Sequence, residues 1–131
     1  MGLSDLFSGQ PKRFVSQKAF EKNLGRQMAL TPQTLQQLRT YNVTPEKRRK
    51  LEFFFYTNTV EKAAALAEEL KNKNYDVEHR PSVSNAKVQI ITGWTAEIAM
   101  SDNTVLDWTR EMCTLGFAHD CDFDGWGTNA E

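Results

Sequence analysis

The sequence has few of the features that mark a secreted, membrane-spanning or disulfide-stabilised protein. Its 131 residues include only two cysteines and no apolar run as long as a membrane span. Cys113 and Cys121 lack the spacing of a redox or zinc motif, so we expect both thiols to be reduced. The first residues show no charged stretch followed by an apolar segment, and the predicted location is therefore the cytoplasm, without membrane association.

Residues suited to catalysis or cofactor binding are also scarce. The chain has two histidines, His79 and His119, and no glycine-rich phosphate loop. A cysteine nucleophile needs a base within hydrogen-bonding reach. Cys113 is expected on a helix and His119 beyond Gly116, so the sequence does not indicate that the two meet. The histidines and cysteines match no zinc-finger pattern either. We therefore predict no catalytic residues, no metal site and no cofactor, and we predict that the chain is not an enzyme.

The charges are divided unevenly along the chain, although the net charge is only −1. Between residues 11 and 50, ten lysine and arginine residues stand against two glutamates. From residue 97 to residue 131, one arginine stands against eight acidic residues. Such a distribution predicts either attraction between the two halves or binding of partners with opposite charge.

The final twelve residues, DCDFDGWGTNAE, match the letters of a calcium-binding loop. Asp120, Asp122, Asp124, Gly125 and Glu131 fall at the ligand and turn positions of that loop. An EF-hand also needs a helix after its final ligand, and here a glycine stands where paired loops usually have an apolar residue. We therefore interpret residues 122–128 as a β-strand, and calcium binding stays a minor alternative.

Residues 1–48 are predicted to form a basic, helical N-terminal extension. Loosely helical apolar spacing predicts a first helix from Val15 to Met28, which Gly25 weakens. Pro32 is typical of the first position of a helix, so a second short helix is expected to begin there and to end near Asn42.

Residues 49–131 are predicted to form one ferredoxin-like domain. In chain order, the expected elements are a strand at 51–57, a helix at 60–73, strands at 75–80 and 86–98, a helix at 102–115 and a strand at 122–128. This βαββαβ order predicts an α+β sandwich in which two helices cover one face of an antiparallel sheet. Gly93 is expected to mark a bulge or bend, and Gly116 to stand just past the end of the second helix.

The predicted sheet has a second face that carries aromatic side chains. In the strand LEFFFYT, Phe54 and Tyr56 point to one side of the sheet, and Leu51, Phe53 and Phe55 point to the other. We expect either Ile91 or Trp126 to join them. Because large exposed apolar patches usually mark an interaction site, the N-terminal helices or a partner should pack against this face.

Four segments carry a family resemblance, namely LEFFFYTN, ITGW, DWTREMCTLG and DFDGWGT. Through them, residues 51–128 resemble the regulator of ribonuclease activity B family, also called ribonuclease E inhibitor proteins, and Asp124–Thr128 is the most specific element. The resemblance implies a ferredoxin-like fold that binds ribonuclease E and lowers its RNA-cleaving activity without doing chemistry itself. The founding type of inhibitor is strongly acidic, whereas this chain has a basic N-terminal third.

Two functions from different classes follow from these patterns. The first is a non-catalytic regulator that binds a basic protein partner, which the resemblance identifies with ribonuclease E. Its candidate binding residues are Asp120, Asp122, Asp124 and Trp126. The second is a single-stranded RNA-binding module that uses Phe54, Tyr56 and the basic N-terminal arm. The third strand lacks the aromatic signature of RNA recognition modules, which favours the first function. The sequence predicts no oligomeric state.

Overall fold

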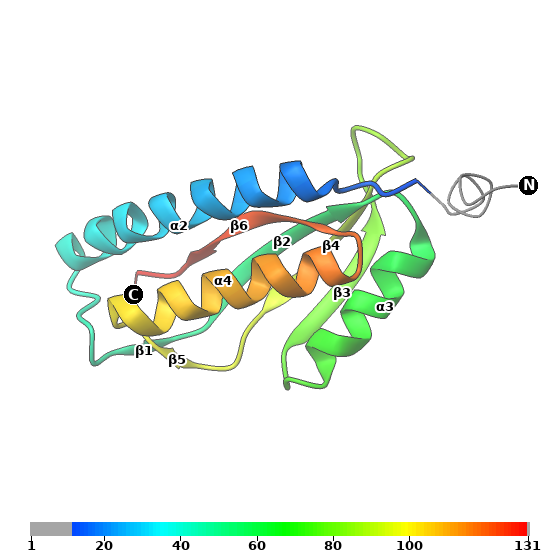
Figure 1. Ribbon diagram of the computed structural model, residues 1–131. Helices are drawn as coiled ribbons and strands as arrows, with labels where there is room; N and C mark the ends of the chain where they lie inside the picture. Colours follow the sequence, from blue (N-terminus) through cyan, green and yellow to red (C-terminus); the bar gives the residue numbers. More distant parts are fainter. Residues whose placement is uncertain (1–11, 131) are drawn as a thin grey trace, which may run out of the picture.

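The computed structural model describes residues 12–130, which form an α+β sandwich with a long N-terminal helix (Figure 1). The helices are α2 (Gln17–Thr40), α3 (Val60–Lys71) and α4 (Asp102–Ala118). The strands are β1 (Arg48–Arg49), β2 (Leu51–Thr57), β3 (Asp76–Pro81), β4 (Gln89–Trp94), β5 (Ile98–Ala99) and β6 (Asp122–Thr128). None of the helices in this part of the chain is long and apolar enough to cross a membrane.

The main sheet has the strand order β3-β4-β2-β6, and every neighbouring pair is antiparallel. Along the chain, these strands and the two helices between them follow the order βαββαβ. Figure 1 shows α3 and α4 on the same side of the sheet. The predicted ferredoxin-like α+β sandwich with an N-terminal helix is confirmed.

The core lies between the sheet and these two helices. Along β2, fully buried side chains alternate with half-buried ones, and Leu51, Phe53 and Phe55 have no exposed surface. Both helices begin just after a capping residue, because the side chains of Thr59 and Ser101 accept hydrogen bonds from backbone N–H groups of the first turn. Their buried apolar stripes then face β2, with Ala63, Leu66, Ala67 and Leu70 from α3 and Val105, Trp108, Met112 and Cys113 from α4.

Helix α2 is continuous, so the prediction of two separate helices was wrong. Pro32 lies inside it at an exposed position. The buried residues of α2 continue in one stripe past this proline, and they are Gln27, Thr31, Leu35 and Leu38. Burial stabilises by roughly 1.5–3 kcal/mol per leucine, which offsets the roughly 3 kcal/mol cost of a proline in a helix. Packing therefore overrides the local helix-breaking signal.

Helix α2 runs antiparallel to α4 along the β6 edge of the sheet (Figure 1). Near its start, the Phe20 ring stacks on Phe117 of α4 with centroids 4.4 Å apart. In the same region, Asn23 donates a hydrogen bond of 2.7 Å to the carbonyl of Phe123 in β6. The helix therefore protects a strand edge that would otherwise expose unpaired backbone groups. It does not lie over the second face of the sheet, so of the two expected covers for that face, the N-terminal helices or a partner, the first was wrong.

The predicted third strand was too long, because the chain leaves the sheet after Trp94. The Thr95 hydroxyl accepts a hydrogen bond of 2.9 Å from the Leu51 N–H, which ends the pairing with β2. The following residues form β5, which pairs with β1 in a separate two-stranded sheet. Gly93 is no bulge, since β4 stays in register with both neighbours there.

Gly116 lies inside α4 and does not end it, because the helix continues to Ala118 and is capped by His119. A Cβ atom at Gly116 would lie 2.8 Å from Cε1 of Phe55 and 2.9 Å from the Cys121 carbonyl oxygen. The glycine therefore allows the last turns of α4 to approach β2 closely, a packing requirement that sequence spacing cannot reveal.

Candidate functional site

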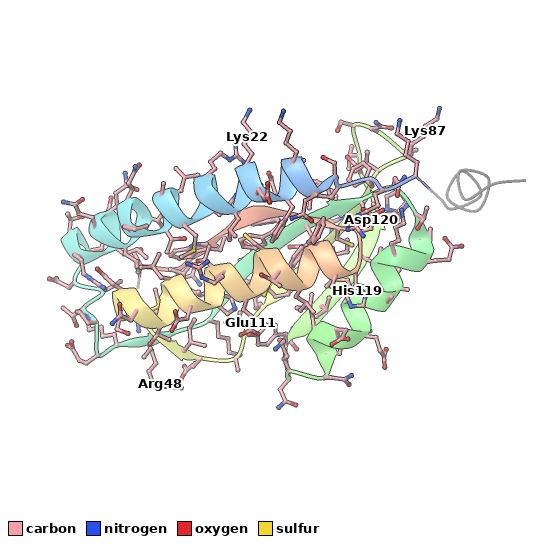
Figure 2. All side chains as sticks on the ribbon, viewed as in Figure 1. Lys22, Arg48, Lys87, Glu111, His119 and Asp120 are labelled. Carbon is pink, nitrogen blue, oxygen red and sulfur yellow. The ribbon has the colours of Figure 1, made fainter. Side chains whose placement is uncertain are left out.

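Asp120, the first predicted binding residue, is buried where the segment that precedes α2 meets α3 (Figure 2). We call this segment, residues 12–16, the N-terminal arm. Its carboxylate accepts hydrogen bonds of 2.8 Å from the backbone N–H groups of Phe14 and Val15. The Lys62 ammonium group donates a third, at 2.6 Å. Burial by itself raises the pKa of Asp120, but these three donors outweigh that effect and hold the pKa below its usual value. The carboxylate therefore anchors the arm inside the molecule.

The other two carboxylates of the predicted acidic surface lie on β6. Asp122 is half-buried and accepts a hydrogen bond of 3.2 Å from Asn23 of α2. Burial raises the pKa of Asp122, and the neighbouring negative charge of Asp124 raises it further. Asp124 is exposed, and its only ion pair in the described chain is a 4.0 Å contact with Arg26. Of the three predicted carboxylates, only Asp122 and Asp124 face a surface that a partner can reach.

Trp126 packs inside the molecule between α2 and α4. Its Nε1 donates a hydrogen bond of 3.0 Å to the Thr31 hydroxyl, and its ring meets Trp108 edge to face with centroids 6.3 Å apart. A register shift between Phe54 and Phe55 of β2 places one extra residue in β6. The shift turns Trp126 to the core side of the sheet. Ile91 is fully buried on the same side. The expectation that Ile91 or Trp126 lies beside Phe54 was therefore wrong for both residues.

The second face of the main sheet carries no helix in the described part of the chain, and we call it the open face. The strand registers place twelve residues there, three from each strand. They are Glu52, Phe54 and Tyr56 of β2, Ile90, Thr92 and Trp94 of β4, Asp76, Glu78 and Arg80 of β3, and Asp122, Gly125 and Gly127 of β6. Half-buried aromatic rings thus lie among four carboxylates and a single guanidinium group.

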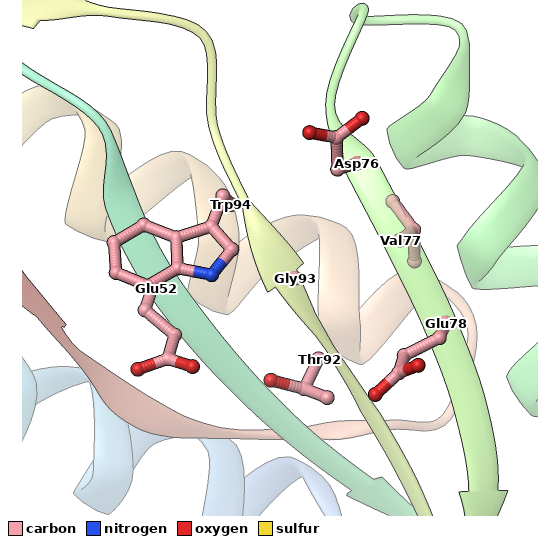
Figure 3. A pocket seen from close by; sticks show the side chains of 7 residues that line it. All are labelled: Glu52, Asp76, Val77, Glu78, Thr92, Gly93 and Trp94. Carbon is pink, nitrogen blue, oxygen red and sulfur yellow. The ribbon is translucent and has the colours of Figure 1, made fainter.

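A hollow of about 260 Å³ lies on the open face between β2, β4 and β3 (Figure 3). Glu52, Trp94 and Asp76 stand directly opposite one another on these three strands, and the indole is turned toward Glu52 and away from the Asp76 carboxylate (Figure 3). Figure 3 shows Glu52 beside the indole on one side of the hollow and Glu78 reaching toward Thr92 from the other side. Aromatic surface and negative charge therefore meet in one depression.

The backbone around the hollow is fixed by close packing of β3 on β4. A Cβ atom at Gly93 would lie 1.8 Å from the carbonyl oxygen of Asp76, so only glycine permits this approach. The Thr92 hydroxyl donates a hydrogen bond of 2.9 Å to the Phe53 carbonyl and is occupied within the sheet. The carboxylates of Glu52, Asp76 and Glu78 and the indole N–H of Trp94 are thus the polar side-chain groups that the hollow presents to a ligand.

The lining residues include no cysteine, histidine, serine or lysine, and the hydroxyl of the one threonine, Thr92, is hydrogen-bonded within the sheet. Cys113 and Cys121 lie in the core, where burial raises their pKa values to about 12 and about 11 and keeps both thiols protonated. Across residues 12–130, no three His, Cys, Asp or Glu side chains gather in a way that could hold a metal ion. The chemistry that the open face does offer is recognition by charge and aromatic contact.

Two basic residues of the N-terminal third, Lys22 and Arg48, lie away from the open face, whereas Arg26 reaches the β6 edge of the sheet and contacts Asp124. Lys22 extends from the exposed side of α2, and Arg48 lies at the far end of the molecule on β1 (Figure 2). Arg48 donates a hydrogen bond of 2.9 Å to the Glu97 carbonyl, which ties the basic run to the two-stranded sheet. Neither Lys22 nor Arg48 therefore extends the aromatic face with positive charge.

Sequence reasoning missed Glu52, Asp76, Glu78 and Trp94 as a group, although part of the signal was available. Glu52 shares the strand parity of Phe54 and Tyr56, which already places it on the second face. The contributions of β3 and β4 depend on the register between strands, which side-chain alternation within a single strand does not determine.

Comparison with protein families matches residues 29–128 to the family described as Regulator of ribonuclease activity B. No curated protein matches the chain. The matched region contains the whole sandwich and the second half of α2, including the Thr31 contact with Trp126. On this match, which covers most of its length, the chain belongs to the regulator of ribonuclease activity B family.

Proposed function

We propose that this protein lowers ribonuclease activity by binding the nuclease through the open face, without doing chemistry itself. Membership of the family implies regulation of ribonuclease activity. The observation that carries the proposal is the open face itself, where aromatic side chains lie among carboxylates and no helix of residues 12–130 covers them. Such a combination is typical of a recognition surface, because aromatic rings supply buried area and charges select the partner.

The sign of the charges favours a basic protein segment as the ligand. Glu52, Asp76, Glu78 and Asp122 place four negative charges on this face, and Arg80 supplies the one positive charge. Glu78 pairs with Arg80 at 2.7 Å, so the remaining three carboxylates dominate the local field. Charges act over about 8 Å at physiological salt, so this local field attracts a cationic segment even though the whole chain is nearly neutral.

The same charges argue against RNA as the ligand of this face. Phe54 and Tyr56 offer ring surfaces on which bases could stack, which is the observation that favours RNA binding. A bound strand would, however, bring its phosphates close to Glu52, Glu78 and Asp122, and this repulsion opposes the binding that stacking would provide. The basic residues that could neutralise phosphates lie on α2 and β1.

The proposal is tested with purified ribonuclease E, the partner that the family resemblance suggests. Capture of the nuclease by the immobilised chain at low salt, together with slower cleavage of an RNA substrate, would support it. No capture and unchanged cleavage at saturating chain would refute it. In a parallel gel-shift assay, a salt-sensitive shift of single-stranded RNA by the chain alone would favour the RNA-binding alternative.

A further inference from the structure

We infer that the hollow beside Trp94 receives an arginine side chain from a basic segment of the protein partner. The inference rests on the proposed function and names the place and the side chain through which the open face recognises its ligand. It starts from the row formed by Glu52, Trp94 and Asp76 across three adjacent strands. Directly opposite residues on neighbouring strands have Cβ atoms about 4.5–5.5 Å apart. The indole is turned toward Glu52 (Figure 3), so the Glu52 carboxylate lies within reach of a cation placed on the ring.

The polar groups of this row have no partner among the described residues. Neither Glu52 nor Asp76 forms an ion pair within residues 12–130, in contrast to Glu78, whose 2.7 Å partner is Arg80. The Trp94 Nε1 donates no hydrogen bond to the described protein atoms, whereas the corresponding atoms of Trp108 and Trp126 each donate one. The row therefore keeps its hydrogen-bonding capacity for a ligand.

Arginine fits these groups better than lysine does. A guanidinium group is planar, so it stacks on an indole ring while its N–H groups donate in a fork to a carboxylate. Figure 3 shows the arrangement that this requires, with the Glu52 carboxylate beside the Trp94 ring and open space toward Glu78. A lysine ammonium group would gain the attraction to the charges but not the paired hydrogen bonds.

The rest of the open face suits the chain on either side of that arginine. The next rows of the sheet, Phe54 with Thr92 and Tyr56 with Ile90, are largely apolar. They can contact the aliphatic part of an arginine or lysine stem while its charged end stays near a carboxylate or in water. The occupant is therefore a segment of the nuclease partner rich in basic residues, with at least one arginine in the hollow.

The test uses two peptides of twelve residues that differ only in having four arginines or four lysines, titrated against the full chain by fluorescence anisotropy at low salt. We expect the arginine peptide to bind at least about fivefold more tightly than the lysine peptide. The variant Glu52→Gln/Glu78→Gln should bind the arginine peptide about tenfold more weakly and lose the preference for arginine. Equal binding of both peptides, or an unchanged affinity of this variant, would overturn the inference.

A matched control removes two charges from the opposite side of the molecule. Glu61 and Glu68 lie on the exposed surface of α3, so Glu61→Gln/Glu68→Gln changes the net charge equally without touching the open face. Its affinity should stay within about twofold of the unmodified chain, since distant exposed charges are screened. Equal weakening by both double variants would show a general charge effect and overturn the specific role of the hollow.

The nuclease assay separates this inference from the proposed function. If the unmodified chain and Glu52→Gln/Glu78→Gln inhibit ribonuclease E equally, the inference about the hollow fails and the proposed function stands. If the unmodified chain prefers the arginine peptide through Glu52 but neither captures nor inhibits the nuclease, the hollow binds arginine and the proposed partner is wrong. Trp94→Leu adds a third readout, because it should reduce the preference for the arginine peptide while the carboxylates of Glu52 and Glu78 remain.

Discussion

The contacts of Asp120 predict that this residue is important for stability, and Asp120→Asn tests that prediction. One carboxylate oxygen accepts from Lys62 at 2.6 Å and from the Phe14 N–H at 2.8 Å, and the other accepts from the Val15 N–H at 2.8 Å. An asparagine supplies one acceptor oxygen and one NH₂ group, so at least one of these positions would set a donor against a donor.

The magnitude follows from the burial of the group. The Asp120 side chain is 11% exposed and the Lys62 side chain 25% exposed, so the substitution leaves a largely desolvated ammonium group without its charged partner, with Asn58 as its remaining acceptor at 2.9 Å. Hydrogen bonds to charged groups contribute about 1.5–3 kcal/mol each, and removing one member of a buried pair costs about 3–5 kcal/mol. Because water still reaches part of Lys62, we expect a loss of about 3 kcal/mol, or about 10 °C in Tm for a chain of this length.

Urea unfolding followed by circular dichroism measures this loss, with Asp107→Asn as the control. Asp107 is exposed on α4, so its substitution should change the free energy of unfolding by less than about 0.5 kcal/mol. A loss below about 1 kcal/mol for Asp120→Asn would show that the arm is not anchored by this carboxylate. A double-mutant cycle with Lys62→Met should show positive coupling, because the two side chains form one hydrogen-bonded pair.

The same residue predicts a pH dependence with a definite sign. The pKa of Asp120 is lower in the folded state than its usual value, so the folded state favours the ionised carboxylate. Its stabilising contribution is therefore present above the unfolded pKa of about 4 and is lost as the pH falls through the folded pKa. The difference in stability between the unmodified chain and Asp120→Asn should shrink over this acidic window, and a constant difference would contradict the argument.

Two further predictions concern the core. Gly116→Ala should destabilise the fold by about 1–3 kcal/mol, because its Cβ would lie 2.8 Å from Phe55. Gly25→Ala in α2 should stabilise it by about 0.5–1 kcal/mol, because a Cβ there would have no neighbour within 4 Å. Urea titrations that fail to show opposite signs for the two variants would refute this. Cys113 and Cys121, with pKa values raised to about 12 and about 11 by burial, should resist iodoacetamide at pH 8 until urea unfolds the chain, and rapid labelling of the folded protein would show that their burial is incomplete.

Local patterns predicted much of the fold, because the elements of the sandwich are determined by residues close in sequence. The strand at 51–57 follows from its run of aromatic residues, and the two core helices follow from their apolar spacing. The continuous helix α2 could not be predicted in this way. Its continuity across Pro32 depends on a buried stripe whose partners, such as Thr109 in α4, lie far away in sequence.

The candidate site was less predictable than the fold, because strand register decides which side chains meet. Sequence placed Phe54 and Tyr56 on the second face, as the structure does. The meeting of Glu52, Trp94 and Asp76 depends on how β2 and β3 align with β4, and one residue of slip would send alternate side chains to the core. The position of Asp120 depends in turn on Lys62 and the N-terminal arm, which are distant in sequence.

Backbone geometry explains why the end of the chain has the letters of a calcium loop. Asp120 has a φ of 57°, a left-handed conformation that aspartate tolerates better than most residues, and it ends the turn after α4. Gly125 has a φ of 116° at the register shift that places the extra residue Asp124 in β6. This bulge lets Phe123 and Trp126, three positions apart, both face the core opposite Phe55 and Phe53, whereas a regular strand would turn one of them outward. The aspartates and the glycine at these positions thus satisfy the needs of a turn and a bulge. An edge strand that pairs with β2 and packs against α2 and α4 accounts for the pattern without an ion.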